Sequence, residues 1–274
     1  CRSCDVSEMT IAPPKNYDAE SRARFLRELG ASQEPVLPIA EAALALASVE
    51  RARVDLGHYR DHLRLLARAL NEIILLKYGY SGDELTYDDL QNANLMRVVD
   101  RRKGLPVVLG ILYIHAARAQ GWDMVGLAFP GHFLVRLADG AERLILDPFH
   151  GGRSCGAVEL RDLLKALSGQ EQELLPEHYA PVSDRDILLR LQNNIKARLL
   201  QTGQSERALA VVEMMQLLAP DLPALLYEAG AIAAQLGNLR SAIASFEAFV
   251  ARTPDGAARY QAAALLQQLK SRLQ

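Results

Sequence analysis

The last third of the chain contains an internal repeat of 34 residues. Three residue types recur at this offset, in the pairs Gly203 and Gly237, Ala208 and Ala242, and Pro220 and Pro254. Apolar residues spaced three and four apart predict two helices in each copy, joined at the glycine and ended by the proline. We expect helices from about Asp186 onward, with 257–273 as a capping helix. Two copies and a cap are too few for a self-sufficient array, so this part should lean on the preceding domain.

The overall composition fits one large or two modest globular domains. Half of the 274 residues are hydrophobic and 23% are charged, which is enough to bury a core. The net charge of −2 provides no general attraction to nucleic acid. The nearest candidate for a basic patch is a short cluster that we interpret as a solvated loop: Arg97, Arg101, Arg102 and Lys103. No run approaches about 18 apolar residues, so the sequence predicts no membrane span and no nucleic-acid partner.

Three cysteines are too few for a disulfide framework. Their odd number fits a reducing cytosol better than secretion, so we expect a cytoplasmic protein. Cys1 and Cys4 lie in a polar segment, residues 1–18, which we expect to be a flexible tail. No second pair of ligands at metal spacing accompanies them, so the sequence predicts no zinc site there.

Helical spacing of apolar residues continues through the first half of the chain. It predicts helices at about 19–29, 38–56 and 59–78, the last ended by Gly79. A fourth helix is predicted at 107–120, with Pro106 at its first turn and Gly121 just past its end. Because this helix is apolar nearly all round, we expect it to be central and fully buried.

Strands are predicted after the buried helix. Residues 124–129 form one candidate, and the stretch Gly131 to Pro148 reads as a hairpin with Asp139-Gly140 as its two-residue turn. That turn sets His132 opposite Asp147, and it also sets Arg136 opposite Arg143, a mildly unfavourable pair. Apolar residues alternate along both halves, which favours an antiparallel sheet and an α+β fold.

An imidazole beside a carboxylate suits base catalysis, because the carboxylate fixes the tautomer and stabilises the imidazolium. The pair His132 and Asp147 is therefore the candidate catalytic dyad, and the alternative is a structural pair that ties two strands together. A catalytic dyad of this kind needs a nucleophile whose proton it can accept. Cys155 lies eight residues after Asp147 in a glycine-rich loop and is a conceivable nucleophile. Together with His150 these residues could surround a metal, but their spacing matches no known ligand pattern, so no metal or cofactor is predicted.

The order of buried helix, strand with His and strand with Asp resembles the papain-like core of the transglutaminase superfamily. In that superfamily the nucleophilic Cys opens the central helix. Arg118 and Gly121 match the closing pattern of that helix, and Gly104 then matches the glycine two residues before the nucleophile. On this alignment the position of the nucleophile falls on Pro106, which has no nucleophilic side chain.

Two further motifs make the resemblance specific. They are Pro-Gly-His-Phe-Leu-Val-Arg at 130–136 and Leu-Asp-Pro-Phe at 146–149. Followed by tetratricopeptide-like helices, they resemble the SirB-type family of bacterial transglutaminase-like proteins, from roughly Leu63 to the C-terminus. The resemblance implies a papain/transglutaminase-like core at 19–180, an all-α tetratricopeptide-like domain at 186–274 and a degenerate site. Members of the family typically lack the thiol, and a regulatory role is suggested for some relatives.

The leading hypothesis is a non-catalytic protein that binds a protein or peptide partner through its cleft or its tetratricopeptide helices. Besides the degenerate dyad His132 and Asp147, the residues expected to line a binding site are Pro106, Asn94, Arg136, His150 and Cys155. The alternative is a hydrolase of amide or acyl bonds that uses the dyad with water or with Cys155.

Overall fold

The computed structural model describes residues 16–34, 36–51, 54–62, 78–139, 142–168 and 173–273. The chain divides into two compact units. The first contains Glu34–Leu191 together with the chain up to Arg22, and the second contains Ala23–Gln33 and Gln192–Gln274. Strands lie in the first unit, and helical repeats make up most of the second, so the α+β prediction is confirmed.

The first unit is built on a five-stranded sheet with the order β6-β5-β4-β3-β7. All its neighbouring strands are antiparallel, as predicted. The strands are β3 (Asp123–Leu127), β4 (Val135–Asp139), β5 (Glu142–Asp147), β6 (Arg153–Ser154) and β7 (Pro181–Val182). The hairpin β4–β5 lies in the middle of the sheet; Asp147 ends β5, and His132 lies in the segment just before β4.

The predicted register of this hairpin was wrong. Arg136 lies opposite Ile145, and Arg143 lies opposite Ala138, so the two arginines do not face each other. Asp139 pairs with Glu142, so the ladder is shifted by two residues from the predicted register; Gly140 of the predicted turn lies outside the described residues. The observed register removes a like-charge pair. Because side chains alternate with a period of two, the shift leaves every residue on its predicted face.

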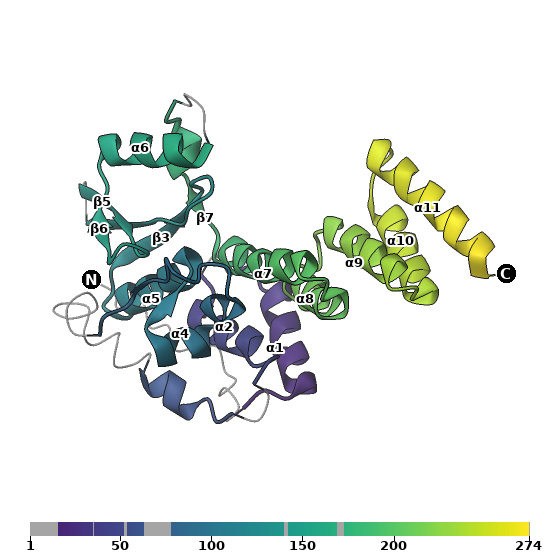
Figure 1. Cartoon of the computed structure of the whole chain (residues 1–274), viewed down its shortest axis with the longest axis horizontal. Helices are drawn as coiled ribbons and strands as arrows, with labels where there is room; N and C mark the ends of the chain where they lie inside the picture. The colour runs from purple at the N-terminus through teal and green to yellow at the C-terminus, as the bar shows by residue number, and fades with distance from the viewer. Residues whose placement is uncertain are drawn as a thin grey trace. The chain divides into compact units, whose positions relative to one another are not determined.

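Helix α5 (Pro106–Ala119) packs on β3 as the central helix. Pro106 is its first residue, where the missing N–H costs nothing, and Gly121 follows its end with φ of 75°. A side chain at Gly110 would overlap the ring of Phe133, since its Cβ would lie 2.2 Å from a ring carbon. Helix α6 (Ala157–Ser168) covers the opposite side of the sheet (Figure 1).

The segments before α5 are mostly helical. They comprise α1 (Ala19–Ala31), α2 (Ile39–Ala47), the 3-10 helix η1 (Leu90–Ala93) and α4 (Leu95–Arg101). The predicted helix at 38–56 is therefore shorter than expected. Most of the predicted helix at 59–78 lies outside the described residues, although 57–62 are helical. A short parallel pair, β1 (Ser81–Gly82) with β2 (Lys103–Gly104), was not predicted. A second 3-10 helix, η2 (Pro176–Tyr179), precedes β7.

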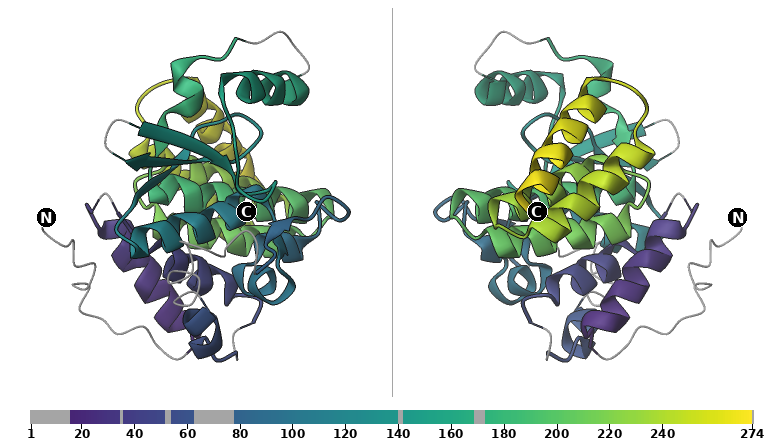
Figure 2. Two further views of the ribbon diagram at one scale, coloured as in Figure 1. Left: turned by 90° about the vertical axis from the view of Figure 1, so that its left-hand side faces the viewer. Right: turned by 90° about the vertical axis from the view of Figure 1, so that its right-hand side faces the viewer.

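The 34-residue repeat forms the predicted helical pairs. The helices are α7 (Asp184–Gln201), α8 (Ser205–Leu218), α9 (Ala224–Gln235), α10 (Leu239–Arg252) and α11 (Ala257–Leu273). Gly203 and Gly237 both have positive φ in the turns, and Ala208 and Ala242 are both fully buried. Figure 2 shows α9, α10 and α11 side by side. None of the helices in the described part of the chain combines the length and hydropathy needed to cross a bilayer.

Candidate functional site

His132 and Asp147 meet through their side chains, although they are not the directly opposed ladder pair that was predicted. His132 lies three residues before β4, and Asp147 is the last residue of β5. The Nε2 atom of His132 lies 2.9 Å from Oδ1 of Asp147. The carboxylate is fully buried and the imidazole is 8% exposed. The arrangement matches an imidazole oriented by a carboxylate, which is the first requirement of a dyad.

The Asp147 carboxylate holds more partners than the sequence indicated. Its Oδ1 accepts the backbone N–H groups of Phe149 at 3.0 Å and His150 at 3.4 Å, and its Oδ2 lies 2.6 Å from Nδ1 of His150. Although burial works to raise it, hydrogen bonds and charge from His132 and His150 lower the pKa of Asp147 to about 2. The carboxylate is thus the fixed centre of the cluster.

Donor atoms of His132, Asp147 and His150 all lie within 4.8 Å of one another. Two imidazoles and a carboxylate are a common ligand set for divalent transition metals. However, the nitrogen–oxygen separations of 2.6 and 2.9 Å are hydrogen-bond distances, and Nε of Arg153 lies 4.0 Å from the same carboxylate. A metal would have to displace both hydrogen bonds, so the geometry fits a hydrogen-bonded cluster better than a metal centre.

Helix α5 packs against the segment that carries His132. Pro106, Gly110 and Tyr113 share one face, since they are spaced by four and three residues. Gly110 contacts Phe133, the residue after His132. Among the described residues the buried Tyr113 hydroxyl has no hydrogen-bond partner, and burial together with the charge of Asp147 raises the pKa of Tyr113. Pro106, one turn before Gly110, therefore lies on the face of α5 that packs on Phe133.

Cys155 is not placed as a nucleophile. It is 7% exposed and belongs to an apolar cluster with Phe129 and Leu164. Its Sγ contacts the carbonyl oxygen of Arg153 at 3.9 Å. Burial and the negative charge of Asp147 raise the pKa of the Cys155 thiol, which is the opposite of what a reactive thiol needs.

Two other predicted lining residues have local partners. Asn94 caps α4, because its Oδ1 accepts the N–H of Arg97 at 3.2 Å and its Nδ2 donates to the carbonyl of Ala47 at 3.2 Å. Arg136 lies on β4, and its Nε atom is buried with no hydrogen bond among the described residues. Among the described residues, neither forms a hydrogen bond or ion pair with His132, Asp147 or His150.

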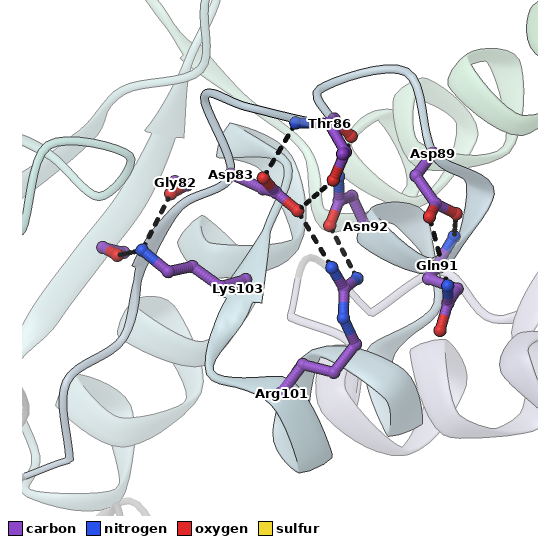
Figure 3. Close-up of polar contacts among 9 residues, drawn as sticks. Gly82, Asp83, Thr86, Asp89, Gln91, Asn92, Arg101 and Lys103 are labelled. Atoms are coloured by element: carbon purple, nitrogen blue, oxygen red, sulfur yellow. Dashed lines mark hydrogen bonds and ion pairs between the residues drawn. The ribbon is translucent and has the colours of Figure 1, made fainter.

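The basic segment 101–103 is not a free loop. Arg101 forms an ion pair with Asp83 at 2.9 Å, Arg102 donates to Tyr80, and Lys103 reaches Ser81 at 2.6 Å. Three successive side chains thereby fasten β2 to residues 80–83, as Figure 3 shows for Arg101 and Lys103. This fastening fixes the start of α5, and the sequence pattern did not reveal it.

Arg190 is a further residue of the site that the sequence did not indicate. Its guanidinium donates to the carbonyl oxygen of His132 at 2.7 Å and lies over the ring of Phe133, 5.4 Å from its centre. It thus fixes the backbone that carries the imidazole. A long-range contact of this kind, from α7 to the turn before β4, leaves no periodic signal in the sequence.

Comparison with known proteins agrees with this architecture. Residues 41–193 match the model of a transglutaminase-like superfamily, and 195–267 match a tetratricopeptide repeat. A UPF0162 protein of Xylella fastidiosa is 31% identical and covers 82% of this chain and 88% of its own length. One from Vibrio cholerae is 29% identical and covers 88% and 89%. F-box only protein 21 of Mus musculus is 33% identical over 30% of this chain and 13% of its own length. The chain belongs to the transglutaminase-like superfamily, as a member of the SirB-type family of UPF0162 proteins.

Proposed function

We propose that this chain is a non-catalytic transglutaminase-like protein that binds a protein or peptide partner. The observation that carries the proposal is Pro106 as the first residue of α5, the position that the resemblance to the transglutaminase superfamily assigns to the nucleophile. Proline has no side chain that can attack a carbonyl, so the dyad has no covalent nucleophile to activate there.

The surroundings of the dyad support the same proposal. His132 is nearly buried, and its Nε2 is directed at Asp147 and not toward a substrate. The carboxylate is saturated by donors from its own loop, as in a structural hydrogen-bonded cluster. Tetratricopeptide repeats build surfaces that bind other proteins, which suggests the class of partner.

A hydrolase that activates water remains the second candidate, because Asp147 orients the His132 ring through Nε2 and leaves Nδ1 as the nitrogen to accept a proton. The environment of Cys155 supports no thiol version of this reaction.

Turnover assays on the full chain separate the two candidates. The assays measure hydrolysis of activated esters and peptide anilides, and incorporation of a primary amine into a glutamine peptide. His132→Gln is the matched variant, since it removes the base and keeps a polar side chain. The proposal predicts no turnover above that of H132Q. Turnover that disappears in both H132Q and D147N would establish the hydrolase.

A further inference from the structure

A pocket of about 500 Å³ lies beside the Asp147 cluster, within the first unit. It is lined by the loop 81–85, by Lys103 and by the turn 149–151. Its volume falls in the range of about 300–1,000 Å³ that is common for ligand sites. His132 and Asp147 are not among its lining residues, and the pocket adjoins the dyad through His150, which contacts Asp147.

Lys103 brings a positive charge to this pocket. Its ammonium group contacts two uncharged acceptors, the hydroxyl of Ser81 at 2.6 Å and the carbonyl of Gly82 at 3.4 Å. An ammonium group carries three donors, and these contacts neutralise none of its charge. His150 borders the same pocket. Because its Nδ1 faces Asp147, its Nε2 is the nitrogen left for a ligand, and it donates to an anion when the ring is an imidazolium.

Asp83, one of the two acidic lining residues, is already bound to donors other than Lys103. Asp83 is 7% exposed, and its carboxylate accepts from the Thr86 N–H at 3.0 Å, the Thr86 hydroxyl at 2.7 Å and Arg101 at 2.9 Å (Figure 3). Hydrogen bonds from Thr86, above all, lower the pKa of Asp83 to about 2. Glu84 is the other acidic lining residue, and it is exposed to solvent, which screens its charge.

The same pocket carries an apolar edge. Leu85 is 97% exposed, the most exposed of the large hydrophobic side chains in the described ranges. The ring of Phe149 lies at the base, packed against Gly82 and edge-on to Tyr87 at 5.8 Å. The exposed side chain of Leu85 and the ammonium group of Lys103, which contacts uncharged acceptors, line the same pocket. This combination favours a ligand that joins an apolar side chain to an anion.

We propose that this pocket binds the C-terminal carboxylate of a partner polypeptide whose last residue is apolar. The carboxylate lies against Lys103 and His150, and the apolar side chain covers Leu85 and Phe149. Charge complementarity selects a free chain end over an internal segment, because only the chain end offers a backbone carboxylate. This inference rests on the proposed function and specifies the chemistry of the partner.

The test is a selection on the full chain from peptides with four randomised C-terminal positions, made once with free carboxylates and once with C-terminal amides. Fluorescence polarisation then measures the selected peptides. Lys103→Met removes the charge and keeps the length of the side chain, and Arg97→Met removes an exposed charge outside the pocket. Leu85→Ser removes the apolar edge, and Glu84→Gln removes the remaining acidic group. Unchanged melting temperatures show that each variant is folded.

The free-acid library should enrich apolar last residues, and the acid should bind at least tenfold more tightly than its amide. K103M should abolish this preference and R97M should preserve it, while L85S should weaken binding and E84Q should not. A free amino acid that binds as well as the peptide would show a metabolite site and overturn the proposal. Lack of enrichment, or equal enrichment from the amide library or with K103M, overturns it as well. These outcomes leave the proposed function standing, whereas His132-dependent turnover contradicts the proposed function whatever the peptides do.

Discussion

His132 Nε2 and Asp147 Oδ1 lie 2.9 Å apart, although the two residues are not partners in the β4–β5 ladder. The contact forms where the turn before β4 meets the end of β5. Arg190 holds the backbone of His132, and the N–H of Phe149 holds the carboxylate of Asp147. The dyad is therefore fixed from both sides by elements that lie outside the hairpin ladder.

Asp147 should be the most sensitive polar residue of the first unit. Asp147→Asn removes the charge from a fully buried group that faces two imidazoles, so we expect a loss of about 3 kcal/mol in the free energy of unfolding. Urea unfolding measures it. Asp255→Asn is the control, because Asp255 is 77% exposed in its ion pair with Arg259 and should contribute less than about 0.5 kcal/mol. Equal losses for the two variants would contradict the central role of the carboxylate.

Stability should fall at acid pH through the same carboxylate. The pKa of Asp147 is about 2 in the folded chain and 3.8 without the structure, so the unfolded chain binds the proton more readily. The contribution is complete above about pH 4 and is lost as the pH falls toward 2. Unfolding measured across this range should show a shallower acid slope in D147N. The pKa of Asp83 is also lowered to about 2, so some slope should remain. Identical slopes in the wild type and D147N would refute the assignment.

Gly110 should tolerate no side chain. In Gly110→Ala the new Cβ would lie 2.2 Å from the Phe133 ring, and we expect a loss of about 2 kcal/mol or more despite the helix propensity of alanine. Gly230→Ala is a matched control, since it also faces a phenylalanine ring from within a helix, but at 3.0 Å. Thermal unfolding should rank G110A below G230A. The reverse order would show that α5 does not pack on Phe133 as described.

Cys155 should react slowly. Because burial raises the pKa of its thiol, we expect iodoacetamide at neutral pH to alkylate it about tenfold more slowly than a small free thiol. Mass spectrometry of the alkylated peptide gives the rate. Fast alkylation would reopen the thiol version of the hydrolase.

The sequence patterns predicted the parts of the fold that repeat or alternate. The turn glycines Gly203 and Gly237 marked the helical pairs, and the alternation along β4 and β5 assigned the correct faces. The exact register escaped because a shift of two residues along the hairpin leaves every side chain of the ladder on the same face, so the alternation does not fix the register. Only the repulsion between Arg136 and Arg143 argued against the predicted register, and its contribution to the free energy is small.

The site was predicted in part. His132 and Asp147 were found because they flank one hairpin, which is a local feature. The Arg190 contact and the ion pair of Arg101 with Asp83 join segments distant in the sequence, and neither has a spacing rule. Pro106 was located only by analogy with a related helix.

The most direct test of the account is the titration of a thiol placed at the start of α5. The variant Pro106→Cys, in a background where the other cysteines are serine, is titrated by its thiolate absorbance. If this position serves the dyad, the helix N-terminus and His132 should lower the thiol pKa from its usual value of about 8.5 to below about 7.5, and H132Q should raise it again. A pKa of about 8.5 or higher that H132Q leaves unchanged would mean that Pro106 does not occupy the position of a lost nucleophile.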